Sequence, residues 1–101
     1  MELELIMTIC NHGSALDVVK SAKEAGAKGG TIIHARGSDT EETRKFFGIV
    51  IQPEKDVVLI VCKADEKKAI MLAIMKDNGS NSQAHSVVFS LPVDEAIGIN
   101  L

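Results

Sequence analysis

The segment from residue 57 to residue 62 reads Val-Val-Leu-Ile-Val-Cys, and it constrains the fold more than any other part of the chain. Successive side chains of a β-strand point to opposite faces, so this run places apolar groups on both faces of its sheet. We therefore expect a strand from Asp56 to Lys63 that is covered on both sides. The cover must come from the rest of this 101-residue chain or from another copy of it.

The other elements follow from periodicity and from turn residues. Alternating or β-prone composition predicts further strands at Glu2–Cys10, from Gly30 to Gly37 and at Ser86–Leu91, while the β-prone run Phe46–Ile51 leads into the central strand with Pro53 between them. Helical spacing predicts one helix from Ser14 to Gly26, with Ser14 as its N-cap, and a second from Asp65 to Asn78. The apolar faces expected for these helices are Leu16, Val19, Ala22 and Ala25 in the first and Ala69, Ile70, Ala73 and Ile74 in the second.

The predicted order is strand, helix, strand, strand, helix, strand, in a single domain over residues 1–101. This order predicts an α+β fold in which both helices lie on one face of an antiparallel sheet. Since the central strand has no polar face, the bare side of the sheet is expected to contact another subunit. The sequence thus predicts a homo-oligomer.

Composition excludes several classes of function. The chain has 11 basic and 14 acidic residues, a net charge of −3, which argues against a nucleic-acid-binding protein. No apolar run approaches the roughly 20 residues that cross a bilayer, so we expect no direct membrane insertion. The N-terminus does not resemble a signal peptide, and the two cysteines match no metal-binding spacing, so we expect a cytoplasmic protein with buried thiols.

Three segments in order, Gly26–Gly37, Phe46–Lys55 and Phe89–Ile97, carry a family resemblance. Over nearly its whole length the chain resembles the PII signal-transduction family, in particular its short branch of PII-like nitrogen regulators. The resemblance implies a ferredoxin-like βαββαβ sandwich that assembles as a homotrimer. It also implies a partner-binding T-loop at about 37–46, a phosphate-binding B-loop at about 79–86 and a short C-terminal segment at 93–101.

The same resemblance implies an adenine nucleotide between subunits, but several of the family's phosphate-binding residues are replaced here. Glycines of the B-loop are replaced by Ala84 and Ser86, and its basic residue is replaced by Val87. Two arginines of the C-terminal segment are replaced by Gly98 and Asn100. The residues that remain for a nucleotide or a small anion are Thr31, Gly37, Ser38, Lys55 and His85. Loss of three cations predicts weak triphosphate binding, because each charge-assisted hydrogen bond contributes about 1.5–3 kcal/mol.

The segment that corresponds to the T-loop is short and charged. The residues expected to contact a partner are Asp39, Thr40, Glu41, Glu42, Thr43, Arg44 and Lys45. The chain has no tyrosine, which excludes the tyrosine modification known in the family. The resemblance implies that the partner is a membrane transporter or a metabolic enzyme, with nitrogen metabolism as the expected setting. It leaves open whether 2-oxoglutarate is sensed.

Other interpretations of the same residues stay open. His34 and Arg36 share one strand face and form either an anion site at the base of the T-loop or an ion pair at the trimer rim with an acid such as Glu41. Cys10 and His12 suggest a divalent-metal-binding trimer of the CutA type, which shares this fold. No motif for catalysis is present, so we do not expect an enzyme. A ligand-free assembly module is the remaining alternative.

Overall fold

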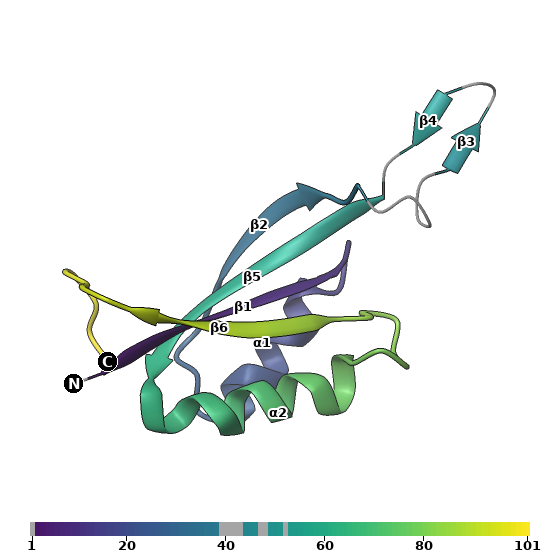
Figure 1. The fold of residues 1–101 in the computed structure, drawn as a ribbon. Helices are drawn as coiled ribbons and strands as arrows, with labels where there is room; N and C mark the ends of the chain where they lie inside the picture. The colour runs from purple at the N-terminus through teal and green to yellow at the C-terminus, as the bar shows by residue number, and fades with distance from the viewer. Residues whose placement is uncertain (1, 39–43, 47–48, 52) are drawn as a thin grey trace.

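A four-stranded antiparallel sheet with strand order β2-β5-β1-β6 forms the body of the computed structural model (Figure 1). The structure describes residues 2–38, 44–46, 49–51 and 53–101. The elements are β1 (Leu3–Asn11), α1 (Ala15–Glu24), β2 (Thr31–Arg36), β3 (Arg44–Phe46), β4 (Ile49–Ile51), β5 (Glu54–Lys63), a 3₁₀ turn (Ala64–Glu66), α2 (Lys67–Asn78) and β6 (Val87–Val93). The main sheet and the two helices confirm the predicted α+β, ferredoxin-like arrangement.

The apolar run of the sequence lies in β5, which pairs with β1 on one side and β2 on the other. Its even-numbered residues Val58, Ile60 and Cys62 are buried beneath the helices, together with Ile6 of β1. The odd-numbered residues from Val57 to Val61 lie on the opposite face and are only half-buried. The central position of β5 explains why its composition is apolar throughout.

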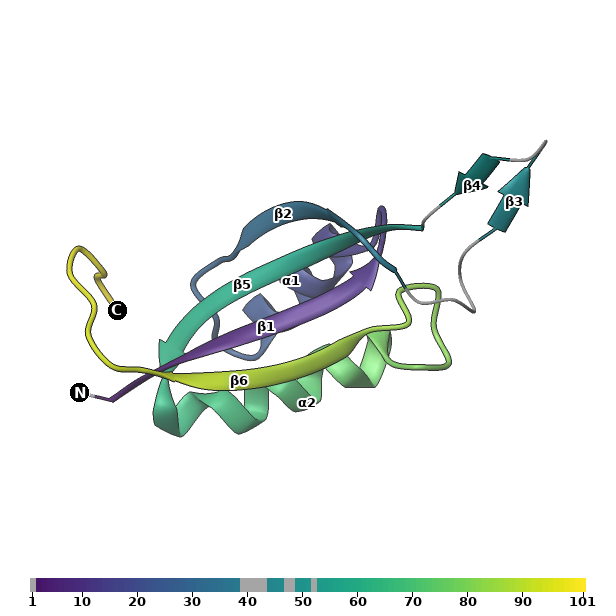
Figure 2. The same ribbon diagram turned by 45° about the horizontal axis from the view of Figure 1, so that its top comes forward.

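Both helices cover the same face of the sheet, and Figure 2 shows α1 behind β5 and β1 and α2 along β6. Of the face expected for α1, Ala22 is buried and Val19 and Ala25 pack against the core, but Leu16 is 74% exposed, and Ala15 and Val18 are buried in its place. Two small residues and a valine let the helix approach the sheet closely, and a leucine in that position would hold it away. Ser14 precedes α1 as expected, but its side chain makes no capping hydrogen bond.

In α2 the buried apolar residues are Ile70 and Ile74, as predicted, while Ala69 is exposed and Ala73 only half-buried. Buried Asn78 ends this helix and donates from Nδ2 to Ser21 Oγ of α1 and to the Ile74 carbonyl, both at 3.0 Å. The bond to Ser21 links the two helices, and the bond to Ile74 lies within α2.

The face of the sheet away from the helices carries exposed apolar side chains. Ile33 of β2 and Val87, Phe89 and Leu91 of β6 are all more than one-third exposed, and they lie on the two edge strands, on either side of the half-buried odd-numbered residues of β5 and β1. An open face of this composition is the one on which the sequence predicts a subunit contact.

Beyond the ends of β2 and β5, strands β3 and β4 pair with each other in a separate antiparallel ladder (Figure 1). The sequence predicted one β-prone run at 46–51 after an exposed loop ending at Lys45. Instead, Arg44 and Lys45 belong to β3, and only Ile49–Ile51 forms β4. The expected partner-binding residues Asp39 to Thr43 lie outside the described residues.

Among the described residues, no helix is both long enough and apolar enough to cross a membrane.

Candidate functional site

A hollow of about 580 Å³ opens where β2 and β5 leave the main sheet toward the β3–β4 ladder. Its lining residues come from the turn after β1, the end of β2 and the start of β5: His12, His34, Ala35, Arg36, Glu54 and Lys55. Four of these side chains are basic, counting both imidazoles, and one is acidic. The composition suits an anion or a metal ion better than an apolar ligand.

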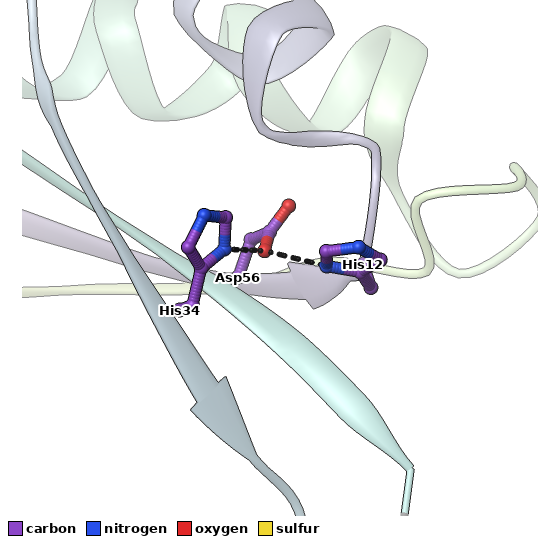
Figure 3. A group of neighbouring side chains, drawn as sticks. All are labelled: His12, His34 and Asp56. Carbon is purple, nitrogen blue, oxygen red and sulfur yellow. Dashed lines mark hydrogen bonds and ion pairs between the residues drawn. The ribbon is translucent and has the colours of Figure 1, made fainter.

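Two of these lining residues, His12 and His34, contact the carboxylate of Asp56, which is buried and does not itself line the hollow (Figure 3). Its Oδ1 lies 3.1 Å from Nδ1 of His12 and 3.0 Å from Nδ1 of His34, while its Oδ2 accepts a 2.9 Å hydrogen bond from the Gly13 N–H. The Asp56 side chain is only 4% exposed, whereas the two imidazoles are 52% and 76% exposed. A buried carboxylate thus holds two histidines that solvent can reach.

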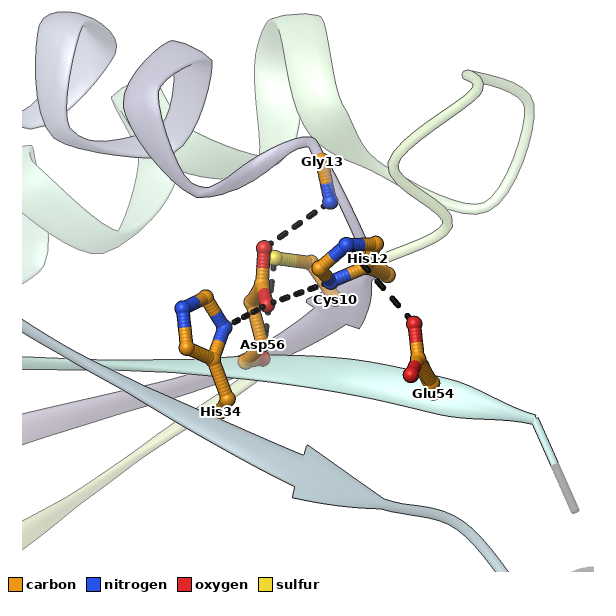
Figure 4. Close-up of polar contacts among 6 residues, drawn as sticks. All are labelled: Cys10, His12, Gly13, His34, Glu54 and Asp56. Carbon is orange, nitrogen blue, oxygen red and sulfur yellow. Dashed lines mark hydrogen bonds and ion pairs between the residues drawn. The ribbon is translucent and has the colours of Figure 1, made fainter.

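Strand register explains this arrangement. Asp56 pairs with Cys10 of β1 and with His34 of β2, so the three side chains point to the same face of the sheet. That face is the helix-covered one, and at this end the cover is the turn between β1 and α1. Gly13 has a φ of +93° in this turn, a conformation that glycine adopts without strain, and it turns its N–H toward Asp56 (Figure 4).

The hydrogen bonds decide the charge of Asp56. Burial alone would raise the pKa of this carboxyl, but the Gly13 N–H and the imidazoles of His34 and His12 outweigh burial and hold the pKa below its ordinary value. Asp56 is therefore ionised at neutral pH. Burial, with Asp56 nearby, raises the pKa of the Cys10 thiol to about 11, so Cys10 stays protonated and donates to the Asp56 carbonyl at 3.7 Å.

A second polar group joins Lys55 to the segment predicted as the B-loop. Lys55 Nζ donates to Asn11 Oδ1 at 2.9 Å, and Asn11 in turn donates from Nδ2 to the Gln83 carbonyl and from its main-chain N–H to the Ala84 carbonyl. A side chain at Gly37 would contact Lys55, since a Cβ there would lie 3.4 Å from Lys55 Cε. Lys55, Gly37 and residues 83–84 are thus neighbours.

The other residues predicted to bind a nucleotide or an anion do not join Lys55 and Gly37 in the same way. Thr31 pairs with Leu59, at the opposite end of β2 from Arg36, so one protomer does not bring it to Lys55. His85 is exposed, and its Nδ1 lies 2.9 Å from the Ser80 carbonyl within its own loop. Ser38 is exposed and follows Gly37.

The side-chain contacts bear on two roles that the sequence left open, those of His34 and of the Cys10–His12 pair. His34 contacts Asp56, and the acid proposed as a rim partner, Glu41, lies outside the described residues. His12 gathers with His34 and Asp56, and Cys10 does not join that group of potential metal ligands among the described residues. Sequence reasoning missed Asp56 and Glu54, although the lone carboxylate at the start of an apolar strand was a visible signal.

Comparisons with known proteins agree with this fold. The family model described as "Nitrogen regulatory protein P-II" matches residues 3–100. The crystal structure of Arabidopsis thaliana PII bound to citrate matches with a TM-score of 0.68 and 20% identity, covering 96% of this chain and 80% of that one. A search of curated proteins finds no match. At 20% identity the Arabidopsis structure shows a shared fold, and the family model, which spans almost all of the sequence, shows that this chain belongs to the nitrogen regulatory protein P-II family.

Proposed function

We propose that this chain is a trimeric PII-type regulator that controls a target protein from the cytoplasm, with the segment at about 37–46 as its docking element. The observation that carries this proposal is the position of the β3–β4 ladder, which stands apart from the main sheet where a partner can reach it (Figure 1). Proteins of this family are regulators that bind target proteins as trimers. A transporter or a metabolic enzyme is the proposed target, and we propose no catalytic activity.

The open face of the sheet supports the trimer. Phe89 and Leu91 are 38% and 45% exposed on a face that also carries Ile33 and Val87, and monomers rarely expose so continuous an apolar strip. Burial of apolar surface contributes about 25 cal/mol per Å², so covering this strip with the same face of neighbouring copies stabilises the assembly. The central strand is then covered on both sides.

A small anion is the proposed ligand at the base of the docking segment. Lys55 and Arg36 supply positive charge in the hollow, and Gly37 lies beside the Lys55 side chain. The related Arabidopsis protein is bound to citrate, a multivalent anion. Since the B-loop lacks the family's glycines and basic residue, we propose that a small anion or an adenine nucleotide with few phosphates binds better than a triphosphate.

Affinity capture tests the docking element. Tagged wild-type protein and a variant with residues 39–45 replaced by Gly-Ser are used as bait, and a variant with the exposed segment 94–100 replaced in the same way is the matched control. We expect a target held by the wild type and by the control to be lost from the first variant. Equal capture by all three would refute docking through this segment.

Thermal unfolding tests the ligand. It is followed with a dye, because the chain has no Trp or Tyr, in the presence of ATP, ADP, AMP, cyclic nucleotides or citrate. A ligand at 100 times its Kd adds about 2.7 kcal/mol per site, which is readily seen for a domain of this size. We expect Lys55→Ala to abolish the shift and Lys23→Ala, on the exposed surface of α1, to retain it. No shift with any ligand would favour the ligand-free assembly module.

A further inference from the structure

Three side chains from separate segments converge beside the hollow, and two of them, His12 and His34, line it. His12 follows β1, His34 lies in β2 and Asp56 in β5, and one potential ligand atom from each lies within 4.8 Å of the others (Figure 3). The two imidazole rings are tilted by 60° with centroids 5.6 Å apart, on either side of the carboxylate oxygen. Two imidazoles and one carboxylate are a donor set that zinc and neighbouring divalent transition metals prefer.

We propose that His12, His34 and Asp56 bind a divalent transition-metal ion of the zinc type. Bonds of about 2.0–2.2 Å place the donors of a tetrahedral zinc site about 3.3–3.6 Å apart. Asp56 Oδ1 is already 3.1 Å from His12 Nδ1 and 3.0 Å from His34 Nδ1, so these pairs need to separate by only a few tenths of an ångström. The site does not depend on the regulatory function proposed above.

Neighbouring groups orient two of the three ligands as the outer partners of metal sites do. Asp56 Oδ2 is occupied by the Gly13 N–H at 2.9 Å, which turns Oδ1 toward the imidazoles (Figure 4). On the far side of the His12 ring, Nε2 lies 3.7 Å from Glu54 Oε2. When an ion takes the place of the Nδ1 proton, a carboxylate at this position stabilises the tautomer with its proton on Nε2.

Access and coordination number also suit a metal ion. Both imidazoles are more than half exposed on the wall of the hollow, so an ion enters without opening the core. Three protein ligands leave at least one coordination position for water or for a small anion in the hollow. Asp56 is the one carboxylate among the three ligands, and because it is buried and hydrogen-bonded to the Gly13 N–H, its free oxygen has a fixed position for the ion.

The competing explanation is a hydrogen-bonded cluster that only holds the three segments together. In that case each imidazole carries its proton on Nδ1 and donates it to Asp56 Oδ1. A bound metal takes the place of those two protons, so the histidine tautomers differ between the two explanations. This difference can be measured on the wild-type chain.

The experiment is a titration of the metal-free full-length chain, dialysed against a chelator, with Zn²⁺ by calorimetry and with Co²⁺ by visible absorption. The variants are His12→Ala, His34→Ala and Glu54→Gln. The matched control is His85→Ala, since the chain's third histidine is exposed and lies in a different loop. Circular dichroism checks that each variant is folded.

We expect one ion per chain, at least a 100-fold loss of affinity for His12→Ala and His34→Ala, roughly a 10-fold loss for Glu54→Gln and no change for His85→Ala. Proton–nitrogen NMR of the wild type should show the protons of His12 and His34 moving from Nδ1 to Nε2 on addition of Zn²⁺. Absence of binding, equal binding by all variants, or equal losses in His85→Ala and His34→Ala would overturn the proposal. Unchanged tautomers of His12 and His34 at saturating Zn²⁺ would overturn the proposal as well. Because this measurement uses the wild type, it holds even if a variant fails to fold.

Discussion

The buried hydroxyl of Thr8 allows a direct test of what an unpaired polar group costs in this core. It is fully buried on the helix-covered face of β1, between Ile6 and Cys10, and it pairs with Val58 of β5 and Val88 of β6. Its hydroxyl has no hydrogen-bond partner among the described residues. Replacing Thr8 with valine keeps the shape of the side chain and replaces the hydroxyl by a methyl group. We expect the protein to become more stable.

The magnitude follows from the cost of burying an unpaired hydroxyl, about 1–3 kcal/mol in proteins. Thr8→Val removes this cost and adds an apolar group to a closely packed site, so the free energy of unfolding should rise by about 1–3 kcal/mol. Thr8→Ser is the matched control, because it keeps the hydroxyl and deletes the methyl group. That variant should lose about 1 kcal/mol.

Urea unfolding followed by circular dichroism measures both variants at one fixed chain concentration, because the stability of an oligomer depends on concentration. The absence of Trp and Tyr rules out intrinsic tryptophan or tyrosine fluorescence as the probe. We expect the midpoint for Thr8→Val to rise and the slope to stay constant. A lower midpoint would refute the reasoning, since it would mean that the hydroxyl has a hydrogen-bond partner, such as a buried water.

Three further predictions concern other parts of the molecule. Phe89→Asp on the open sheet face should convert the proposed trimer to monomers in analytical ultracentrifugation, whereas Leu16→Asp on the helical surface should leave the assembly intact. Asn78→Ala removes two buried hydrogen bonds and should lower the free energy of unfolding by about 2–3 kcal/mol in the same urea assay. Burial raises the pKa of Cys62 above its ordinary 9.0, so the stability it contributes is complete below pH 9 and is lost as the pH rises further. Urea midpoints of Cys62→Ala should therefore fall less steeply above pH 9 than those of the wild type.

The fold could be predicted because its signals are local. Alternation in β1 and β6, the doubly apolar composition of β5 and the spacing of Ile70 and Ile74 are each contained within one element. Leu16 was placed wrongly in the buried face of α1 for the same reason. Both Leu16 and the pair Ala15 and Val18 have helical spacing with Ala22, and only packing against the sheet decides between them.

The candidate site was harder to predict because strand register assembles it. Cys10 and His34 lie 46 and 22 residues from Asp56 along the chain and become its neighbours only through the pairing of β5 with β1 and β2. A slip of one residue in either ladder would turn the partner side chain to the opposite face. The sequence identified His12 and His34 as candidates, but it could not show that the Asp56 carboxylate contacts both of them.

The pairing of β2 with β5 also connects the proposed metal site to the proposed docking segment. Arg36 and Glu54 form the last residue pair of β2 and β5, followed by the hydrogen bond from the Gly37 N–H to the Pro53 carbonyl at 2.8 Å, after which the chain leads to β3 and β4. His34 and Asp56 pair just two residues before that exit. An ion bound between them would fix the ends of both strands that support the docking segment, whereas an anion beside Lys55 would act on the same strand ends through Gly37. A ligand can favour one conformation of a docking segment only if it binds that conformation more tightly. Comparing metal affinity with and without a captured target would measure this coupling directly, because each must change the affinity for the other by the same factor.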